Sequence, residues 1–159
     1  MNSTSLSECL PYAKHLDAEH RRIQAVVEQI QASYLLDGWP HTRPDDQERT
    51  TIFLEQLRAL RDRLRDHFEE EKTGGCIEEA VSRAPNLGSA AAQLEREHSE
   101  LLSHLTSIDD MVRSYRFSRR TAPDIELAFN DFAEILYDHE TDENRILEQG
   151  FNISADSDL

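Results

Sequence analysis

Residues 128–146, with the sequence AFNDFAEILYDHETDENRI, indicate most directly which fold the chain adopts. Apolar residues recur here at alternating spacings of three and four, which places them on one face of an α-helix and not on a strand. Two positions on the same face are ionisable. The predicted inward face comprises Ala128, Phe132, Ile135, His139, Glu143 and Ile146. The stretch therefore predicts a helix that carries a histidine and a glutamate into the protein interior.

Three other segments repeat this pattern, and clusters of glycine and proline near residues 38–44, 74–75, 85–88 and 123 separate the four segments. Four helices joined by shorter loops predict an all-α fold, an antiparallel up-down-up-down four-helix bundle. We expect a single domain with its core at about residues 7–150 and a flexible tail at 151–159. The three further faces are Ala13, Leu16, His20, Ile23, Val27, Ile30 and Tyr34; Phe53, Leu57, Leu60, Leu64, His67 and Glu71; and Leu94, His98, Leu101, Leu105, Ile108, Val112 and Tyr115.

The net charge of the chain indicates which classes of molecule it does not bind. Among 159 residues, 17 are Lys or Arg and 32 are Asp or Glu, which gives a net charge of −15. Such a surface repels phosphate backbones and anionic headgroups, so we expect no nucleic-acid partner and no membrane partner. The first residues lack the pattern of a signal peptide. Cys9 and Cys76 are too few for a disulfide scaffold, so we interpret them as inert residues of a protein from a reducing, cytoplasmic compartment.

Six ionisable residues occupy positions that the four faces would otherwise give to apolar side chains. Each face carries one histidine, and on two faces a glutamate follows four residues later, so that both side chains point the same way. Buried charges without partners are costly, and six would unfold an ordinary core. At a rise of about 1.5 Å per residue, the four histidines also lie at similar depths in the bundle. The sequence therefore predicts a metal site formed by His20, His67, Glu71, His98, His139 and Glu143.

The chain also contains an internal repeat. The pattern Leu-x-x-Glu-His ends at His20 and again at His98, and the pattern His-x-x-acid-Glu begins at His67 and again at His139. Two copies of one helical hairpin, related by a pseudo-twofold axis, provide two histidines for each of two metals and two glutamates to bridge them. Imidazole and carboxylate ligands suit iron, manganese or zinc, and bridging carboxylates in a bundle are typical of di-iron or di-manganese centres.

These motifs resemble the hemerythrin-like (HHE cation-binding) domains over about residues 7–150. The resemblance implies a non-haem centre of two iron ions, oxo- or hydroxo-bridged, that binds or reacts with O2, peroxide or nitric oxide. The matching residues include Glu19 and Glu97, which precede the first and third histidines, and Glu70 and Asp142. By this resemblance, one iron is bound by His20 and His67, the other by His98 and His139, and the bridges are Glu71 and Glu143.

The chain differs from the oxygen-carrying members of this family, which have a fifth histidine where this sequence has Leu102. They also place an aspartate where this sequence has Asn144. Four histidines and two glutamates look more like the iron-centre repair proteins and the iron- and oxygen-sensing relatives. We therefore expect a di-iron protein, with oxidase-like or peroxidase- and catalase-like turnover left open. The alternatives are an iron- or oxygen-sensing or iron-delivery protein without turnover, and a structural bundle that holds zinc.

Other polar residues near the motifs receive simpler interpretations. His15 is expected at the surface, and His104 in solvent or beside a ligand. Glu70 and Asp142 are interpreted as acceptors for histidine N–H groups, with direct ligation left open. The remaining acidic residues of the motifs are interpreted as charges on solvated faces, namely Glu19, Glu69, Glu97 and Glu140.

Overall fold

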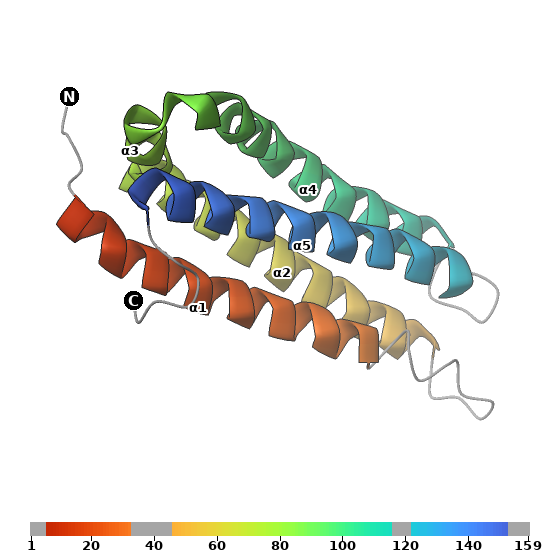
Figure 1. Ribbon diagram of the computed structural model, residues 1–159. Helices are drawn as coiled ribbons and strands as arrows, with labels where there is room; N and C mark the ends of the chain where they lie inside the picture. The colour runs from red at the N-terminus through yellow and green to blue at the C-terminus, as the bar shows by residue number, and fades with distance from the viewer. Residues whose placement is uncertain (1–5, 33–45, 116–121, 153–159) are drawn as a thin grey trace.

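A computed structural model describes residues 6–32, 46–115 and 122–152, which are almost entirely helical. The four long helices lie side by side and antiparallel, as the sequence predicts (Figure 1). A short helix and a 3-10 turn connect the second and third long helices at one end of the bundle. In order along the chain, the elements are α1 (Leu6–Ile30), α2 (Asp46–Gly74), α3 (Cys76–Arg83), η2 (Pro85–Leu87), α4 (Gly88–Tyr115) and α5 (Ala122–Phe151).

Helix α3 occupies a connection in which the sequence predicts only a loop. Gly75 separates it from α2 and adopts a left-handed conformation with φ 69°, which glycine tolerates better than other residues. Its buried Ala80 packs so closely against Gly150 of α5 that a side chain at position 150 would collide with Ala80. The glycine therefore allows α3 to close this end of the bundle.

The interior contains two apolar clusters, one on each side of the six predicted metal ligands in sequence and in space. The larger cluster, cluster A, fills the bundle toward the α1–α2 and α4–α5 connections and includes Ile23, Phe53, Leu64, Leu101 and Phe132. The smaller cluster, cluster B, lies at the α3 end. Its buried members are Cys9, Ala13, Leu16, Cys76, Ala80, Leu87, Leu94, Ile146, Leu147 and Phe151.

The predicted inward faces of α1, α2 and α4 are correct at the positions whose side chains are described, except that His98 is partly exposed. Tyr34 and the side chain of Tyr115 lie outside the described residues. The face predicted for α5 is partly wrong, because Phe129 and Leu136 are fully buried whereas Ala128 and Ile135 are only partly buried. The apolar stripe is wide there, and Phe129 buries more surface than its smaller neighbour Ala128 would.

The interpretation of the cysteines is corrected by the structure. Cys9 of α1 and Cys76 of α3 form a disulfide with a Cα–Cα distance of 5.7 Å, and both residues are buried in cluster B. The two residues are 67 positions apart, and only the unpredicted α3 brings them together. Cysteine usage therefore no longer favours a reducing compartment, because stable disulfides are typical of oxidising ones.

Two other sequence-based expectations fall wholly or partly on residues outside the described ranges. The segment 38–44 and residues 153–159 of the tail predicted at 151–159 lie outside them. Phe151, the first residue of that predicted tail, belongs instead to α5 and is buried in cluster B. None of the helices in the described ranges is long and apolar enough to cross a lipid bilayer.

Candidate metal centre

The six predicted ligands converge from four helices at one level of the bundle, between clusters A and B. His20 comes from α1 and His98 from α4, while α2 and α5 each supply a histidine and the glutamate one turn later. The spacing of four residues places both side chains of such a pair on the inner face of their helix. Five of the six residues are buried, and His98 is partly exposed.

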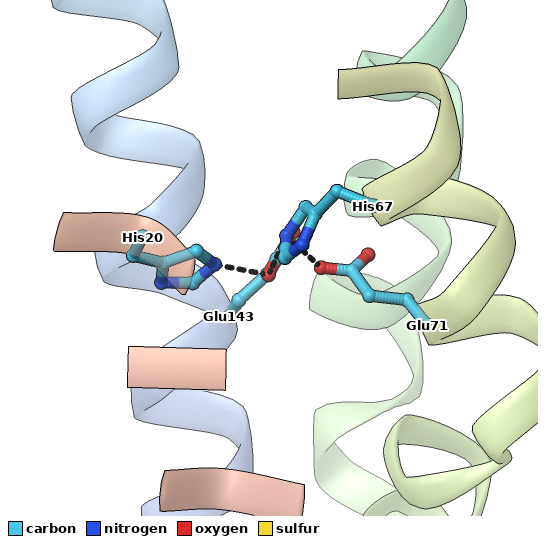
Figure 2. A group of neighbouring side chains, drawn as sticks. All are labelled: His20, His67, Glu71 and Glu143. Atoms are coloured by element: carbon cyan, nitrogen blue, oxygen red, sulfur yellow. Dashed lines mark hydrogen bonds and ion pairs between the residues drawn. The ribbon is translucent and has the colours of Figure 1, made fainter. Parts of the chain in front are cut away.

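The first half of the site joins α1, α2 and α5 (Figure 2). Nε2 of His20 lies 3.0 Å from Oε2 of Glu143, and Nε2 of His67 lies 3.0 Å from Oε1 of Glu71. A longer contact of 3.9 Å joins Nε2 of His67 to Oε2 of Glu143. Two imidazoles therefore face one oxygen from each glutamate.

The second half repeats this arrangement with the other oxygen of each glutamate. Nε2 of His98 lies 3.2 Å from Oε2 of Glu71, and Nε2 of His139 lies 2.5 Å from Oε1 of Glu143. Each carboxylate thus directs one oxygen toward each pair of histidines. This division of oxygens is the arrangement that a carboxylate adopts when it bridges two metal ions.

The potential ligand atoms form two groups of four residues. In each group the atoms lie within 4.8 Å of one another, and both groups contain Glu71 and Glu143. One group adds His20 and His67, and the other adds His98 and His139. The structure therefore brings together all six residues and divides them between two positions as the sequence predicts.

Several ligand atoms are buried without a hydrogen bond, which indicates that they would accept a cation. These atoms are Nε2 of His67, His98 and His139 and Oε1 of Glu71 and Glu143. They lie close to one another but lack the alignment of a hydrogen bond, because several of them point at common positions. Leaving buried polar atoms unpaired is costly, and metal ions bound by neutral imidazoles and carboxylates would pair all of them. The donor set suits iron, manganese or zinc.

The electrostatics of the site favour bound positive charge. Burial raises the pKa of Glu71, and the neighbouring charge of Glu143 raises it further. Burial would also raise the pKa of Glu143, but the close side chains of Glu71 and the histidines stabilise its charged form and hold the pKa well below its usual range. Burial lowers the pKa of His67 and His98, yet the two glutamates outweigh this effect and raise the values to about 10 and about 9. Without metal, protons on the histidines compensate the carboxylates.

Glu97 has a defined role that the sequence analysis missed. Its Oε1 lies 3.0 Å from Nδ1 of His139, in the next helix of the bundle. A hydrogen bond donated from Nδ1 to this carboxylate leaves the lone pair of Nε2 directed at the site. The expectation that Glu97 is a solvated charge is therefore wrong. Its counterpart in the repeat, Glu19, pairs instead with Arg22 and Arg63, each at 3.2 Å.

Glu140 also differs from its prediction as a solvated charge. It is buried, and Gln24 donates a hydrogen bond to its Oε2 at 3.2 Å. Burial raises the pKa of Glu140 to about 7. The helical face predicted for α5 gave no signal for this burial, because Glu140 lies beside His139 and outside the pattern.

The two acidic residues that were expected to accept histidine hydrogen bonds in the site do not lie there. Glu70 is exposed and pairs with the exposed His15 at 2.7 Å, whereas Asp142 pairs with Arg145 at 3.3 Å. Among the residues that the structure describes, neither belongs to a group that could hold a metal ion. His15 is at the surface as predicted, and His104 lies along an outer groove of α4 away from both groups.

Two aromatic residues near the site were not identified from the sequence. Phe68 stacks on His98 with ring centres 4.1 Å apart and planes inclined by 11°. Tyr12 has a buried hydroxyl without a hydrogen bond, and burial together with the charges of Glu71 and Glu143 raises its pKa. Phe68 directly follows His67 in the sequence. Tyr12 carries no comparable signal, because it precedes His20 by about two helical turns.

Comparisons with known proteins identify a family. No curated protein and no solved structure matches the chain significantly. The hemerythrin HHE cation-binding domain matches residues 12–149, a span that includes all six residues of the site. The chain therefore belongs to the hemerythrin HHE cation-binding domain family.

Proposed function

We propose that the protein is a non-haem di-iron protein that binds or reacts with O2, peroxide or nitric oxide. The observation that carries this proposal is the division of oxygens, in which Glu71 and Glu143 each direct one oxygen to each pair of histidines. A carboxylate-bridged pair of metal ions uses this arrangement, whereas a single ion would leave half of the histidine nitrogens unused.

The donor set supports iron and an open coordination position. Each of the two groups supplies two imidazole nitrogens and oxygens from two carboxylates. Non-haem iron commonly keeps further positions open for exogenous ligands when the protein supplies few donors. Bound iron would supply electrons or a Lewis acid to such a ligand. The residues of the chain hold the ions, exclude most water and orient His139 through Glu97.

The experiment is anaerobic loading of the metal-free protein with ferrous iron, followed by desalting, elemental analysis and optical spectra before and after exposure to air. We expect two iron ions per chain and new near-ultraviolet bands on oxidation. In Glu71→Ala we expect the paired site to be lost, because one bridge and one negative charge disappear. The matched control is Glu70→Ala, which removes an exposed carboxylate from the adjacent position.

The same preparations separate the competing functions. Sustained consumption of peroxide by the iron-loaded protein would support an enzyme. A stable coloured adduct without turnover would support a sensing or iron-delivery protein. Tightly held zinc that does not respond to air, or two irons retained in Glu71→Ala, would contradict the proposal.

A further inference from the structure

A small cavity reaches the metal centre from the surface between α2, α3 and α4. We call it the His98 cavity. It has a volume of about 60 Å³, and both His98 and Glu71 contribute to its wall. Lys72, Ala91, Leu94 and Glu95 also line it. The cavity therefore connects solvent to two ligands that belong to the second half of the site.

The exposure of the ligands agrees with this connection. The side chain of His98 is 19% exposed, whereas those of His20, His67 and His139 are at most 5% exposed. Phe68 stacks on the ring of His98 and covers part of it. The cavity accordingly leads to the edge of the His98 imidazole and to Glu71, and it does not open the centre as a whole.

A larger groove lies on the opposite side of the site, between α1 and α5. We call it the His20 groove. It has a volume of about 380 Å³, but His20 is its only predicted ligand. Glu140 and Gln24 also line it, and they are hydrogen bonded to each other at the side of His20. Because His20 itself is buried, this groove ends at the ligand shell and does not enter it.

The charges along the His98 cavity select what can enter. Glu78 and Glu95 are exposed beside it and Glu71 lies at its inner end, while Lys72 is its one basic lining residue. Small anions are repelled by such a lining, whereas uncharged molecules of two or three heavy atoms are not. The volume is also sufficient for only one or two such molecules, since one water occupies about 30 Å³ in the liquid.

We propose that the His98 cavity is the passage by which a small uncharged ligand reaches the metal centre, and that this ligand binds on the side of His98 and Glu71. This inference rests on the proposed di-iron function. The passage restricts the rate at which the ligand enters and leaves. Its lining residues other than His98 and Glu71 belong to neither group of potential metal ligands, so a change in them should leave the equilibrium affinity unchanged.

The test is stopped-flow association of nitric oxide with the anaerobic diferrous protein, compared with two variants. Ala91→Phe places a ring in the His98 cavity, and Ala91→Leu is a smaller obstruction at the same position. Ala25→Phe is the matched control, because Ala25 lines the His20 groove. Iron content and thermal unfolding are measured for each variant, so that a loss of folding is not read as a blocked passage.

We expect the association rate to fall by about tenfold in Ala91→Phe and by less in Ala91→Leu, with dissociation slowed equally. The equilibrium affinity then stays unchanged, and Ala25→Phe retains the rate of the original chain. Equal rates in the original chain and both Ala91 variants would overturn the passage while leaving the di-iron function intact. So would a slower rate in Ala25→Phe alone. No nitric oxide adduct in the original chain would refute the di-iron function and the passage with it.

Discussion

The two halves of the site arise from one repeated motif but have different surroundings. In the first half, His20 and His67 are buried, and Glu19 pairs with arginines on the outer side of the bundle. In the second half, His98 borders a cavity and Glu97 accepts a hydrogen bond from His139. The repeat supplies the histidines, the bridging glutamates and the glutamate before His20 and before His98. Residues outside the repeat decide which side is open and whether that preceding glutamate orients a histidine or pairs with arginines.

The largest expected effect is that of replacing Glu143, which contacts the histidines of both halves. Glu143 contacts all four histidines, at 2.5 to 3.9 Å. We expect Glu143→Gln to lose both metal ions, since a neutral amide cannot replace the bridging charge. Elemental analysis after iron loading checks this, with Glu134→Gln on the exposed face of α5 as the control. Retention of one ion in Glu143→Gln would show that the halves are independent.

The two hairpins of the repeat also differ at Cys9, which forms the disulfide with Cys76. Leu87 stands as far before His98 as Cys9 stands before His20, so the second hairpin has an apolar residue at the corresponding position. A cross-link between residues 67 positions apart stabilises a protein by about 4 kcal/mol in the chain-entropy description. We expect a loss of that order in the free energy of unfolding for the Cys9→Ser, Cys76→Ser double variant.

Denaturant unfolding of the metal-free protein measures this loss, with and without a reductant. The original chain in reductant should approach the stability of the double variant. Identical unfolding curves for the original chain in oxidising and reducing buffers would mean that the cysteines are not paired in solution.

Glu19 and Glu97, which precede His20 and His98, provide a matched pair of variants for the comparison. Glu97→Gln weakens the acceptor that orients His139, and we expect metal affinity in the second half to fall by about 10- to 100-fold. Glu19→Gln should change affinity much less, because Glu19 contacts arginines and no ligand atom at hydrogen-bond distance. Competition with a chelator of known affinity measures both variants, and equal losses would contradict the assigned role of Glu97.

A smaller effect concerns protons. In the metal-free fold the pKa of His67 and His98 is raised to about 10 and about 9, so both imidazoles are protonated at pH 7. Metal binding requires neutral imidazoles, and the pKa of His139 is raised as well, so we expect the release of at least about two protons per chain when the site is filled at this pH. A pH indicator in weakly buffered solution detects the release during titration with ferrous iron.

The same raised pKa values determine how the stability of the metal-free protein depends on pH. A raised pKa stabilises the metal-free fold fully below the unfolded value of 6.5, and this contribution is lost as the pH rises through about 9 and 10. Metal affinity should increase over the same interval, because fewer protons have to leave. Proton release that is absent at pH 7 would contradict the protonated state of these histidines.

The sequence was sufficient to predict the bundle and the six residues that converge at its candidate metal centre, because both depend on local periodicity. The faces of α1 and α2 are read from spacing alone, and the pairs at His67 and His139 follow from the four-residue helical repeat. The α5 face was less well predicted, since a wide apolar stripe allows Phe129 to replace Ala128 in the core.

The remaining features depend on contacts between distant segments. The bond from His139 to Glu97 joins α5 to α4, and the disulfide requires α3 to fold against α1. No pattern within a single helix predicts such contacts, because the relative rotation of neighbouring helices decides them. For the same reason, Glu140 is buried beside Gln24 although its position in α5 suggested solvent.

The most direct test of the central claim is an anomalous difference map from crystals of the iron-loaded protein, collected at the iron absorption edge. We expect two peaks in each molecule, one between His20 and His67 and the other between His98 and His139, with Glu71 and Glu143 spanning both. A single peak at either position, or iron only on the acidic surface, would contradict a carboxylate-bridged pair.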